Sequence, residues 1–411
     1  MSLIVMKFGG PALGDIDRIK NAAAKVATEA RRGHQIAVVV SAMPGVTDQL
    51  IGFCRAIAPH YDRREHDTVV STGEQVTSGL MALALQQRGL NARSWQGWQL
   101  RLLTDSTHAK AKILSVETEP LQKTLAEGTI AVVAGFQGVT DEGRVTTLGR
   151  GGADASAVAL AVALKADRCD LYADAQGVYT TDPRLVSGAR RIDQLSYEEM
   201  MELMALGEKF VQSRAVEIAM RHRMPVQILS AFANETGSDL PGTLLTERNQ
   251  DMEKNSVTGI VCTRDEAKIT LAQIPDAPGR AAGVFLPLAQ AGISVGMIVQ
   301  NASNDSQTID ITFTVTQSDR DRAVTLLKGE QERLGFQRIL AAGPVARVSV
   351  VGVGMRNHAN VAATMFSTLA DKGINIQAIE TSAISTSVVI GDDYTELALR
   401  ALHAAYGLEK A

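Results

Sequence analysis

The stretch LIVMKFGGPAL, Leu3 to Leu13, decides the class of fold. Its first six residues are apolar apart from Lys7 and rich in branched side chains, which is typical of a strand buried in a parallel sheet. Gly9 and Gly10 follow at once and allow backbone amides to approach an anion closely. A cation and two glycines at the carboxyl end of a buried strand indicate a phosphate site. A tight corner between a strand and a helix is the alternative.

The same pattern of strand and helix continues to about residue 245. Apolar runs at 36–40 and 130–136 indicate further buried strands. Between the strands, alanine and leucine recur at helical spacing in 15–32, 73–89 and 154–166. Strands alternating with helices predict an α/β domain, with a mostly parallel sheet between helix layers.

Beyond a polar stretch at 246–256 the pattern changes to alternating strands and short helices, and an internal repeat begins. Residues 268–301 align with residues 347–381, each reading strand, turn, helix, glycine turn, strand. This is half of a ferredoxin-like βαββαβ unit, although βαβ pieces look alike in many α/β proteins. We expect a domain at 1–245, a linker at 246–260 and two smaller domains at 261–335 and 336–411, with interleaving of the last two left open.

Composition limits the classes of partner and compartment. The 411 residues carry a formal net charge of −4, which gives no electrostatic reason to expect nucleic acid or a membrane as partner. The three cysteines are scattered and show no metal-ligand spacing, so we expect free thiols, no protein metal site and a cytoplasmic location. Residues 1–8 resemble neither a signal peptide nor a membrane span.

Four further segments carry polar residues where strands end or helices begin. Ser41 and Thr47 lie in VVVSAMPGVTDQL, Glu74 in VVSTGEQVT, and Arg150 and Asp154 in TTLGRGGADASAVALA. The fourth segment, LYADAQGVYTTDPRL, holds a loop that could bind a nucleotide. Helix capping by Thr47 or Asp154, a dipole effect at Glu74, a surface charge at Arg150 and a solvated DPR turn are the structural alternatives.

The order and spacing of these segments resemble the aspartate kinases of the amino acid kinase superfamily. The resemblance rests on KFGG, SAMPGVT, STGEQVT, GRGGADASAVALA, YADAQGVYTTDPR and EKFVQSRAVEIA. In the C-terminal part, PDAPG, MIVQNAS, VGVGMR and INIQAIETS resemble the two regulatory ACT domains of that family. The resemblance to the family covers nearly the whole chain.

The resemblance implies transfer of the γ-phosphoryl group of ATP, with Mg²⁺, to the side-chain carboxylate of L-aspartate. The product would be 4-phospho-L-aspartate, in the first step toward lysine, threonine and methionine. Because the acceptor carboxylate is already ionised at pH 7, such an enzyme must position two anions and neutralise charge. The resemblance also implies lysine or threonine as effectors and a homodimer or higher oligomer formed through the ACT domains.

The family pattern carries over residue by residue. The implied catalytic residues are Lys7, Arg150 and Asp154. The implied aspartate-binding residues are Thr47, Glu74, Arg150, Gly151 and Gly152. The implied ATP-binding residues are Lys7, Phe8, Gly9, Gly10, Ser41, Ala173, Asp174, Tyr179, Arg184 and Lys209. The implied effector residues are Asp276, Gln300, Asn375, Ile376 and Thr381.

The chain departs from the family pattern at specific positions. Pro11, Ala12 and Ala153 replace hydroxyl residues around the transfer site, each worth on the order of 1 kcal/mol if it bonded substrate. A hydroxyl is also missing at Ala173 and a carboxylate at Gln176. Slower turnover, or an acceptor other than aspartate, is the expected consequence. In the ACT domains, Gly296 and Ala383 replace the usual acid residues, which predicts weakened or altered feedback.

Three functions therefore remain open from the sequence. The first is an aspartate kinase, including a specialised copy. The second is an amino acid kinase with another carboxylate acceptor, because Arg150 and Glu74 argue only for an amino acid. The third is a non-catalytic protein whose ACT domains sense amino acids. An internal start that yields a separate regulatory subunit is also left open.

Overall fold

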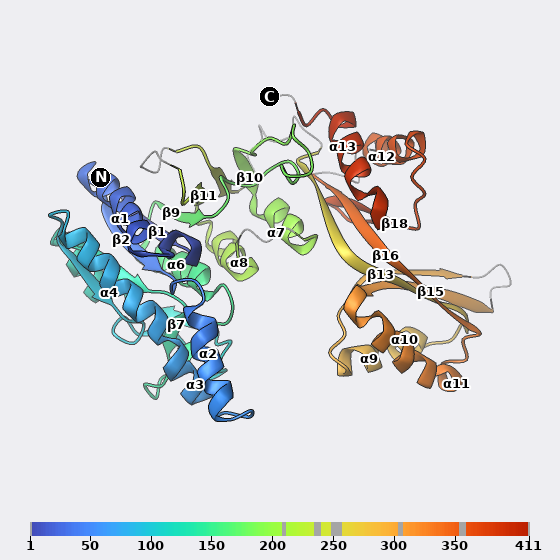
Figure 1. Ribbon diagram of the computed structural model, residues 1–411, viewed down its shortest axis with the longest axis horizontal. Coiled ribbons are helices and arrows are strands. Elements are labelled where there is room, and N and C mark those ends of the chain that lie inside the picture. Colours follow the sequence, from blue (N-terminus) through green and yellow to red (C-terminus); the bar gives the residue numbers. More distant parts are fainter. Residues whose placement is uncertain are drawn as a thin grey trace. The chain divides into compact units, whose positions relative to one another are not determined.

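The computed structural model describes residues 2–207, 211–233, 240–247, 257–302, 307–352 and 359–409. By its internal contacts the chain divides into two compact units (Figure 1). The first holds residues 1–178, 191–204 and 209–250, and the second holds 179–190, 205–208 and 251–411. The segment 179–190 therefore packs with the C-terminal unit, where Val186 shares a buried cluster with Ile260.

An eight-stranded sheet forms the centre of the first unit (Figure 1). β1 lies between β9 and β2 and is parallel to both. Only the pairing of β11 with β12 is antiparallel among the described strands of this sheet. Across the sheet the strands are β10 (Gln194–Ser196), β12 (Thr243–Thr246), β11 (Val226–Ser230), β9 (Arg168–Ala173), β1 (Leu3–Phe8), β2 (Gln35–Val40), β6 (Ile130–Ala134) and β3 (Ala92–Trp95).

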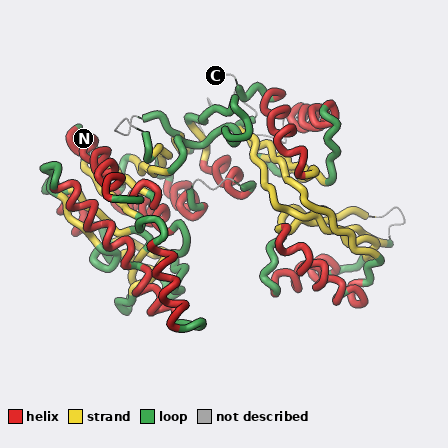
Figure 2. Tube along the Cα trace, viewed as in Figure 1, coloured by secondary structure: helices red, strands yellow, loops and turns green. Residues whose placement is uncertain are grey.

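Helices cover both faces of this sheet, as Figure 2 shows for the long helices beside the strands. Met6 and Phe8 of β1 pack in one apolar cluster with residues of α1 and α4. Because side chains alternate along a strand, Lys7 faces the other side, where α6 packs on β1, β2 and β9 and on α8. The helices of this unit are η1 (Gly10–Leu13), α1 (Ile16–Arg31), α2 (Val46–Ile57), α3 (Arg63–Val70), α4 (Thr72–Gln86), α5 (Glu119–Ala126), α6 (Gly152–Leu164), α7 (Tyr197–Ala205) and α8 (Ser213–His222).

A second, four-stranded sheet leads into α6. Its order is β5 (Ile113–Val116), β4 (Leu102–Thr104), β7 (Gln137–Val139) and β8 (Val145–Thr147). Only residues 148–151 separate the end of β8 from the start of α6. The small sheet therefore fixes one end of the GRGG segment and the long helix α6 fixes the other.

The C-terminal unit contains one six-stranded sheet shared by two ferredoxin-like halves. Ile269 of β13 lies in one apolar cluster and Ile260 of the same strand lies in the other. Figure 2 shows the long strands running from one group of helices to the other. The two halves are thus interleaved. Across the sheet the strands are β14 (Val295–Ala302), β15 (Thr308–Thr316), β13 (Gly259–Pro275), β16 (Arg338–Val351), β18 (Ser385–Gly391) and β17 (Ala378–Thr381), and the helices are α9 (Arg280–Gln290), η3 (Gln317–Asp319), α10 (Arg320–Gly329), α11 (Gln331–Leu334), α12 (Ala359–Asp371), η5 (Asp392–Tyr394) and α13 (Thr395–Ala405).

The repeat seen in the sequence corresponds to β13–α9–β14 and β16–α12–β17. The predicted fold class, an α/β domain followed by two βαββαβ units, is confirmed. Within the described part of the chain, no helix has the length and apolar character needed to cross a membrane.

Candidate active site

The carboxyl ends of β1, β2 and β9 meet at one edge of the large sheet. Ser41 donates its backbone N–H to the carbonyl of Phe8 at 3.1 Å, and Gly9 donates to the carbonyl of Tyr172 at 3.3 Å. Ligands of open α/β sheets bind outside such strand ends. Phe8 itself is fully buried, so it can offer a ligand only its backbone.

Lys7 is held at this edge by a carboxylate from α6. Its Nζ lies 2.5 Å from Oδ1 of Asp154, and both side chains are nearly buried. A Cβ atom on Gly9 would lie 3.2 Å from the same Nζ, so glycine keeps the space beside the ammonium group open. This arrangement can hold an anion such as a phosphate against a fixed cation.

Glu74 is a buried carboxylate with one unpaired oxygen. It lies in the first turn of α4, and Oε1 accepts the backbone N–H of Ala42 at 3.0 Å. Oε2 has no hydrogen-bond partner in the described part of the structure. Burial raises the pKa of Glu74 to about 7, against 4.5 for an ordinary glutamate, because desolvation disfavours the charged form. An unpaired buried carboxylate is suited to receive a cation.

A pocket of about 450 Å³ brings together all five residues predicted to bind aspartate. Its wall is formed by the turn after β2, one face of α2, the start of α4 and the GRGG segment. The sequence-predicted residues in its lining are Ser41, Thr47, Glu74, Arg150, Gly151 and Gly152. Ala42 and Ala153 also line it. Both adjoin the Lys7 edge, since a Cβ on Gly10 would meet the carbonyl of Ala42 at 3.3 Å and Ala153 directly precedes Asp154, the partner of Lys7.

The capping alternatives for Thr47 and Asp154 are wrong. The N-cap of α2 is Gly45, with φ of 79°, and Thr47 lies one residue inside the helix. The N-cap of α6 is Gly151, with φ of 74°, a conformation that favours glycine. The side chains of Thr47 and Asp154 are therefore available for other contacts, and Asp154 uses its own on Lys7.

Gln212, which the sequence reasoning missed, ties these parts together. Its backbone N–H donates to Oδ2 of Asp154 at 3.2 Å, and its Nε2 donates to the carbonyl of Arg150 at 2.8 Å. Gln212 lies next to the start of α8, within the segment EKFVQSRAVEIA. Nothing in the sequence alone distinguishes it from its neighbours, because its contacts come from a helix far away in the chain.

The comparisons with known proteins agree with this geometry. Residues 2–230 match the amino acid kinase family, and residues 272–331 and 348–406 match the ACT domain. The chain is 48% identical to the aspartate kinase of Stutzerimonas stutzeri over 410 residues, which is 100% of this chain and 98% of that protein. The chain belongs to the aspartate kinase family. It is also 42% identical to the aspartokinase of Mycolicibacterium smegmatis, over 99% of this chain and 97% of that one.

Solved structures of aspartate kinases share the fold. The Synechocystis aspartate kinase is 37% identical, covers 99% of this chain and 70% of its own, and has a TM-score of 0.55. Aspartokinase III of E. coli, solved with lysine and aspartate, has a TM-score of 0.82 over 98% of this chain and 99% of its own, at 24% identity. The family, the fold class and the assignment as a kinase are thus confirmed.

The remaining residues that the aspartate kinase family pattern assigns to ATP binding are divided between the two units. Ala173 ends β9 and exposed Asp174 follows it, both at the Lys7 edge of the sheet. Tyr179 and Arg184 belong to the second unit by their contacts, and Arg184 pairs with Asp182 at 2.7 Å. Lys209 lies outside the described residues.

The three lost hydroxyl positions of the aspartate kinase pattern differ in their surroundings. Ala153 lines the pocket. Ala12 packs in the apolar cluster between the sheet and α1. Pro11 is exposed, and its carbonyl accepts a hydrogen bond from Arg18 at 2.9 Å. Only Ala153 of the three lies in the lining of the pocket that contains Glu74.

The predicted effector residues lie near the edges of the shared sheet. Gln300 on β14 and Thr381 on β17 are exposed, and these two edge strands contact each other through a small cluster that contains Met297. Asp276 follows β13, whereas Asn375 and Ile376 lie between α12 and β17. The contact between β14 and β17 brings strands of the two ACT halves together.

Proposed function

We propose that this protein transfers the γ-phosphoryl group of ATP to the side-chain carboxylate of L-aspartate, giving 4-phospho-L-aspartate. The observation that carries the proposal is the pocket in which buried Glu74, with its unpaired Oε2, and Arg150 lie together beside the Lys7 edge. A cation acceptor and a guanidinium group in one cavity match an α-amino acid. The full-length relatives named aspartate kinase support aspartate as that acid.

The proposed roles follow from chemistry at each position. Glu74 takes the α-ammonium group and Arg150 takes the α-carboxylate as a bidentate pair. The side-chain carboxylate of the substrate then points toward Ala42 and Ala153, where the pocket adjoins Lys7. Lys7, oriented by Asp154, offsets the charge on the transferring group, and the acceptor needs no general base because it is already ionised.

The nucleotide fits the other side of the site. Gly9 and Gly10 leave room beside Lys7 for phosphate oxygens, and Ser41, Ala173 and Asp174 lie at the same sheet edge. Mg²⁺ would be held chiefly by the phosphates, as is usual for this ion, and would neutralise their charge. The described residues include no group of three or more His, Cys, Asp or Glu side chains that could hold a metal ion.

Trapping with hydroxylamine tests the proposal and separates the alternatives. Acyl phosphates react with hydroxylamine, so the protein with ATP, Mg²⁺ and L-aspartate should form an acyl hydroxamate. Hydroxamate formed only with another amino acid or carboxylate would replace aspartate as the acceptor. If no acid tested gives an ATP-dependent hydroxamate, the result would favour the non-catalytic sensor instead.

We further propose that the ACT halves mediate a homodimer or higher oligomer and respond to lysine or threonine in the cytoplasm. The ACT match and the exposed edge strands β14 and β17 support the oligomer, and three cysteines that form no disulfide bond support the cytoplasmic location. Gly296 on β14 and Ala383 after β17 lack the acid side chains of the family pattern. Inhibition by lysine or threonine should therefore be weak, and half-inhibition in the micromolar to millimolar range in a steady-state assay would contradict this.

Restoring one hydroxyl tests the departure from the family pattern. Ala153→Ser adds a hydroxyl to the pocket wall and should raise turnover on aspartate by about fivefold, the equivalent of one hydrogen bond. Ala12→Ser, whose side chain packs in the apolar cluster, serves as the comparison and should give no gain. An unchanged or lower turnover for Ala153→Ser would indicate a site rebuilt around the missing hydroxyl.

A further inference from the structure

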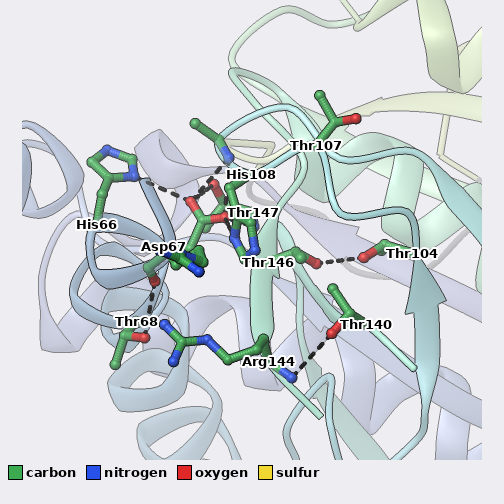
Figure 3. A network of polar contacts seen from close by, with 12 residues as sticks. His66, Asp67, Thr68, Thr104, Thr107, His108, Thr140, Arg144, Thr146 and Thr147 are labelled. Carbon is green, nitrogen blue, oxygen red and sulfur yellow. Dashed lines mark hydrogen bonds and ion pairs between the residues drawn. The ribbon is translucent and has the colours of Figure 1, made fainter. Parts of the chain in front are cut away.

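Asp67 of α3 is fully buried and makes polar contacts with two other segments of the chain and with its neighbour His66 (Figure 3). Oδ1 accepts the hydroxyl of Thr147 at 2.7 Å, and Oδ2 accepts the backbone N–H of Thr147 at 3.0 Å. The backbone N–H of Ala109 contacts both oxygens, at 3.1 and 3.0 Å. Nδ1 of His66 lies 3.1 Å from Oδ1 and Nδ1 of His108 lies 2.8 Å from Oδ2. Both carboxylate oxygens are thus fully used.

The partners of Asp67 form part of the pocket wall. His66, Ala109 and Thr147 all line the cavity that contains Glu74 and Arg150. Thr147 ends β8 only three residues before Arg150. The loop that carries Ala109 also packs on the GRGG segment, because a Cβ on Gly149 would meet the carbonyl of Ala109 at 3.4 Å.

The contacts with Asp67 help to hold the loop at Ala109 in an unfavourable backbone conformation. Ala109 has φ of 68°, in the left-handed region that alanine rarely adopts. A carboxyl group without hydrogen-bond partners would be costly at a buried position, so the donors and Asp67 stabilise each other. One carboxylate therefore fixes the ends of two backbone segments, the loop at Ala109 and the end of β8.

We propose that Asp67 is a positioning residue for the amino-acid half of the site. It acts through the backbone of Thr147 and Ala109 on the placement of Arg150, and it does not touch the substrate. The proposal rests on the proposed function, in which Arg150 binds the α-carboxylate of the acceptor. Misplacement of a binding group by about 1 Å can cost a hundredfold in rate, so the support of Arg150 has a measurable effect.

Asp67→Asn tests this role with little change in volume. The amide cannot accept on both sides, so at least one of the contacts to Thr147 and Ala109 is lost. KM for aspartate should rise about tenfold or more, a size typical of supporting contacts, while KM for ATP stays within about twofold. Glu65→Gln makes the same acid-to-amide change at an exposed position of the same helix and should leave both constants unchanged.

A second pair of variants tests the same role if Asp67→Asn folds poorly. Thr147→Val removes only the hydroxyl donor and should raise KM for aspartate about threefold, the equivalent of a weak hydrogen bond. Thr147→Ser restores the hydroxyl and should return KM to the original value. A KM for aspartate that is unchanged in Asp67→Asn and Thr147→Val, with only stability lowered, would overturn the proposal.

Hydrogen exchange separates this proposal from the proposed function. The amides of residues 145–151 should exchange faster in Asp67→Asn than in Glu65→Gln, whatever acid the protein phosphorylates. Unchanged exchange there would overturn the positioning role even in an active enzyme. Absence of hydroxamate from the unaltered protein with aspartate would overturn the proposed function instead.

Discussion

Replacing Lys7 by methionine is expected to lower the turnover number on aspartate by about a thousandfold or more. Lys7 is the fixed cation of the sheet edge, held by Asp154 at 2.5 Å. Removing one preorganised donor from a transition state that gains charge costs roughly 10²–10³ in rate, and here a full positive charge is lost as well. Methionine is an unbranched side chain of nearly the same length without the charge, so the steady-state turnover number reports mainly the loss of the ammonium group.

Lys20→Met is the matched control for this variant. Lys20 lies on α1 in an exposed ion pair with Asp17, and exposed pairs of this kind contribute little. Its turnover number should equal that of the unaltered protein. A loss of less than about tenfold in Lys7→Met would contradict the role of Lys7, because such a loss is too small for a phosphate-neutralising cation.

The second large effect is expected for Glu74→Gln. If Glu74 receives the α-ammonium group, the variant replaces a charge-assisted contact in a buried pocket with a neutral one, and KM for aspartate should rise about a hundredfold. KM for ATP should stay within about twofold, since that substrate lies on the other side of the site. Steady-state kinetics with each substrate varied in turn measures both constants.

The pH dependence of Glu74 gives a second readout. Burial raises the pKa of Glu74 to about 7, so the free enzyme increasingly holds a neutral carboxyl as pH falls below 7. Binding of an ammonium group needs the ionised form, so KM for aspartate should rise as pH falls through that range, by up to about tenfold per pH unit. Glu74→Gln has no such group and should lose this part of the profile.

The same raised pKa predicts that ionisation of Glu74, which favours substrate binding, lowers the stability of the fold. Because the folded-state pKa lies above the unfolded value, the buried charge destabilises the fold fully above about pH 7, and this cost falls to zero as pH drops below 4.5. Glu74→Gln removes the charge, and at about pH 8 the free energy of unfolding should rise by about 1–2 kcal/mol. The gain is limited because the amide nitrogen still lacks a partner.

Glu119→Gln controls for the loss of an acid from a first helical turn. Glu119 lies in the first turn of α5 and is exposed. It should change neither KM for aspartate nor stability beyond a few tenths of a kcal/mol, about the size of a surface dipole effect. Equal effects of the two variants would show that Glu74 acts through the helix dipole, which was the structural alternative drawn from the sequence.

The sequence predicted the framework well because strand periodicity is local. The run at 3–8 coincides with β1, and the helix expected at 15–32 corresponds to α1 (Ile16–Arg31). The strand expected to continue to Phe136 ends at Ala134 instead. Phe136 has φ of 66°, so the backbone turns there, and no composition cue marks that turn.

Contacts between distant segments could not be predicted in the same way. Asp67 was not singled out, because an acid within a short helix is expected to be solvated. Its burial depends on β8 and the loop at Ala109, which are distant in the sequence. The segment containing Tyr179 and Arg184 follows a strand of the first unit, yet Val186 packs into the second. Periodicity predicts whether a segment is a helix or a strand. Burial of an apolar residue in a distant core decides which unit the segment joins.

In the proposed mechanism, Glu74 and Arg150 select an α-amino acid, and Lys7 offsets the charge on the phosphoryl group that is transferred to its side-chain carboxylate. The most direct test compares kcat/KM for L-aspartate with that for succinate, which keeps both carboxylates and lacks the ammonium group, in the hydroxylamine assay. We predict a preference for L-aspartate of about a thousandfold or more, because succinate leaves the buried Glu74 unpaired. Comparable rates with the two acids would contradict the account.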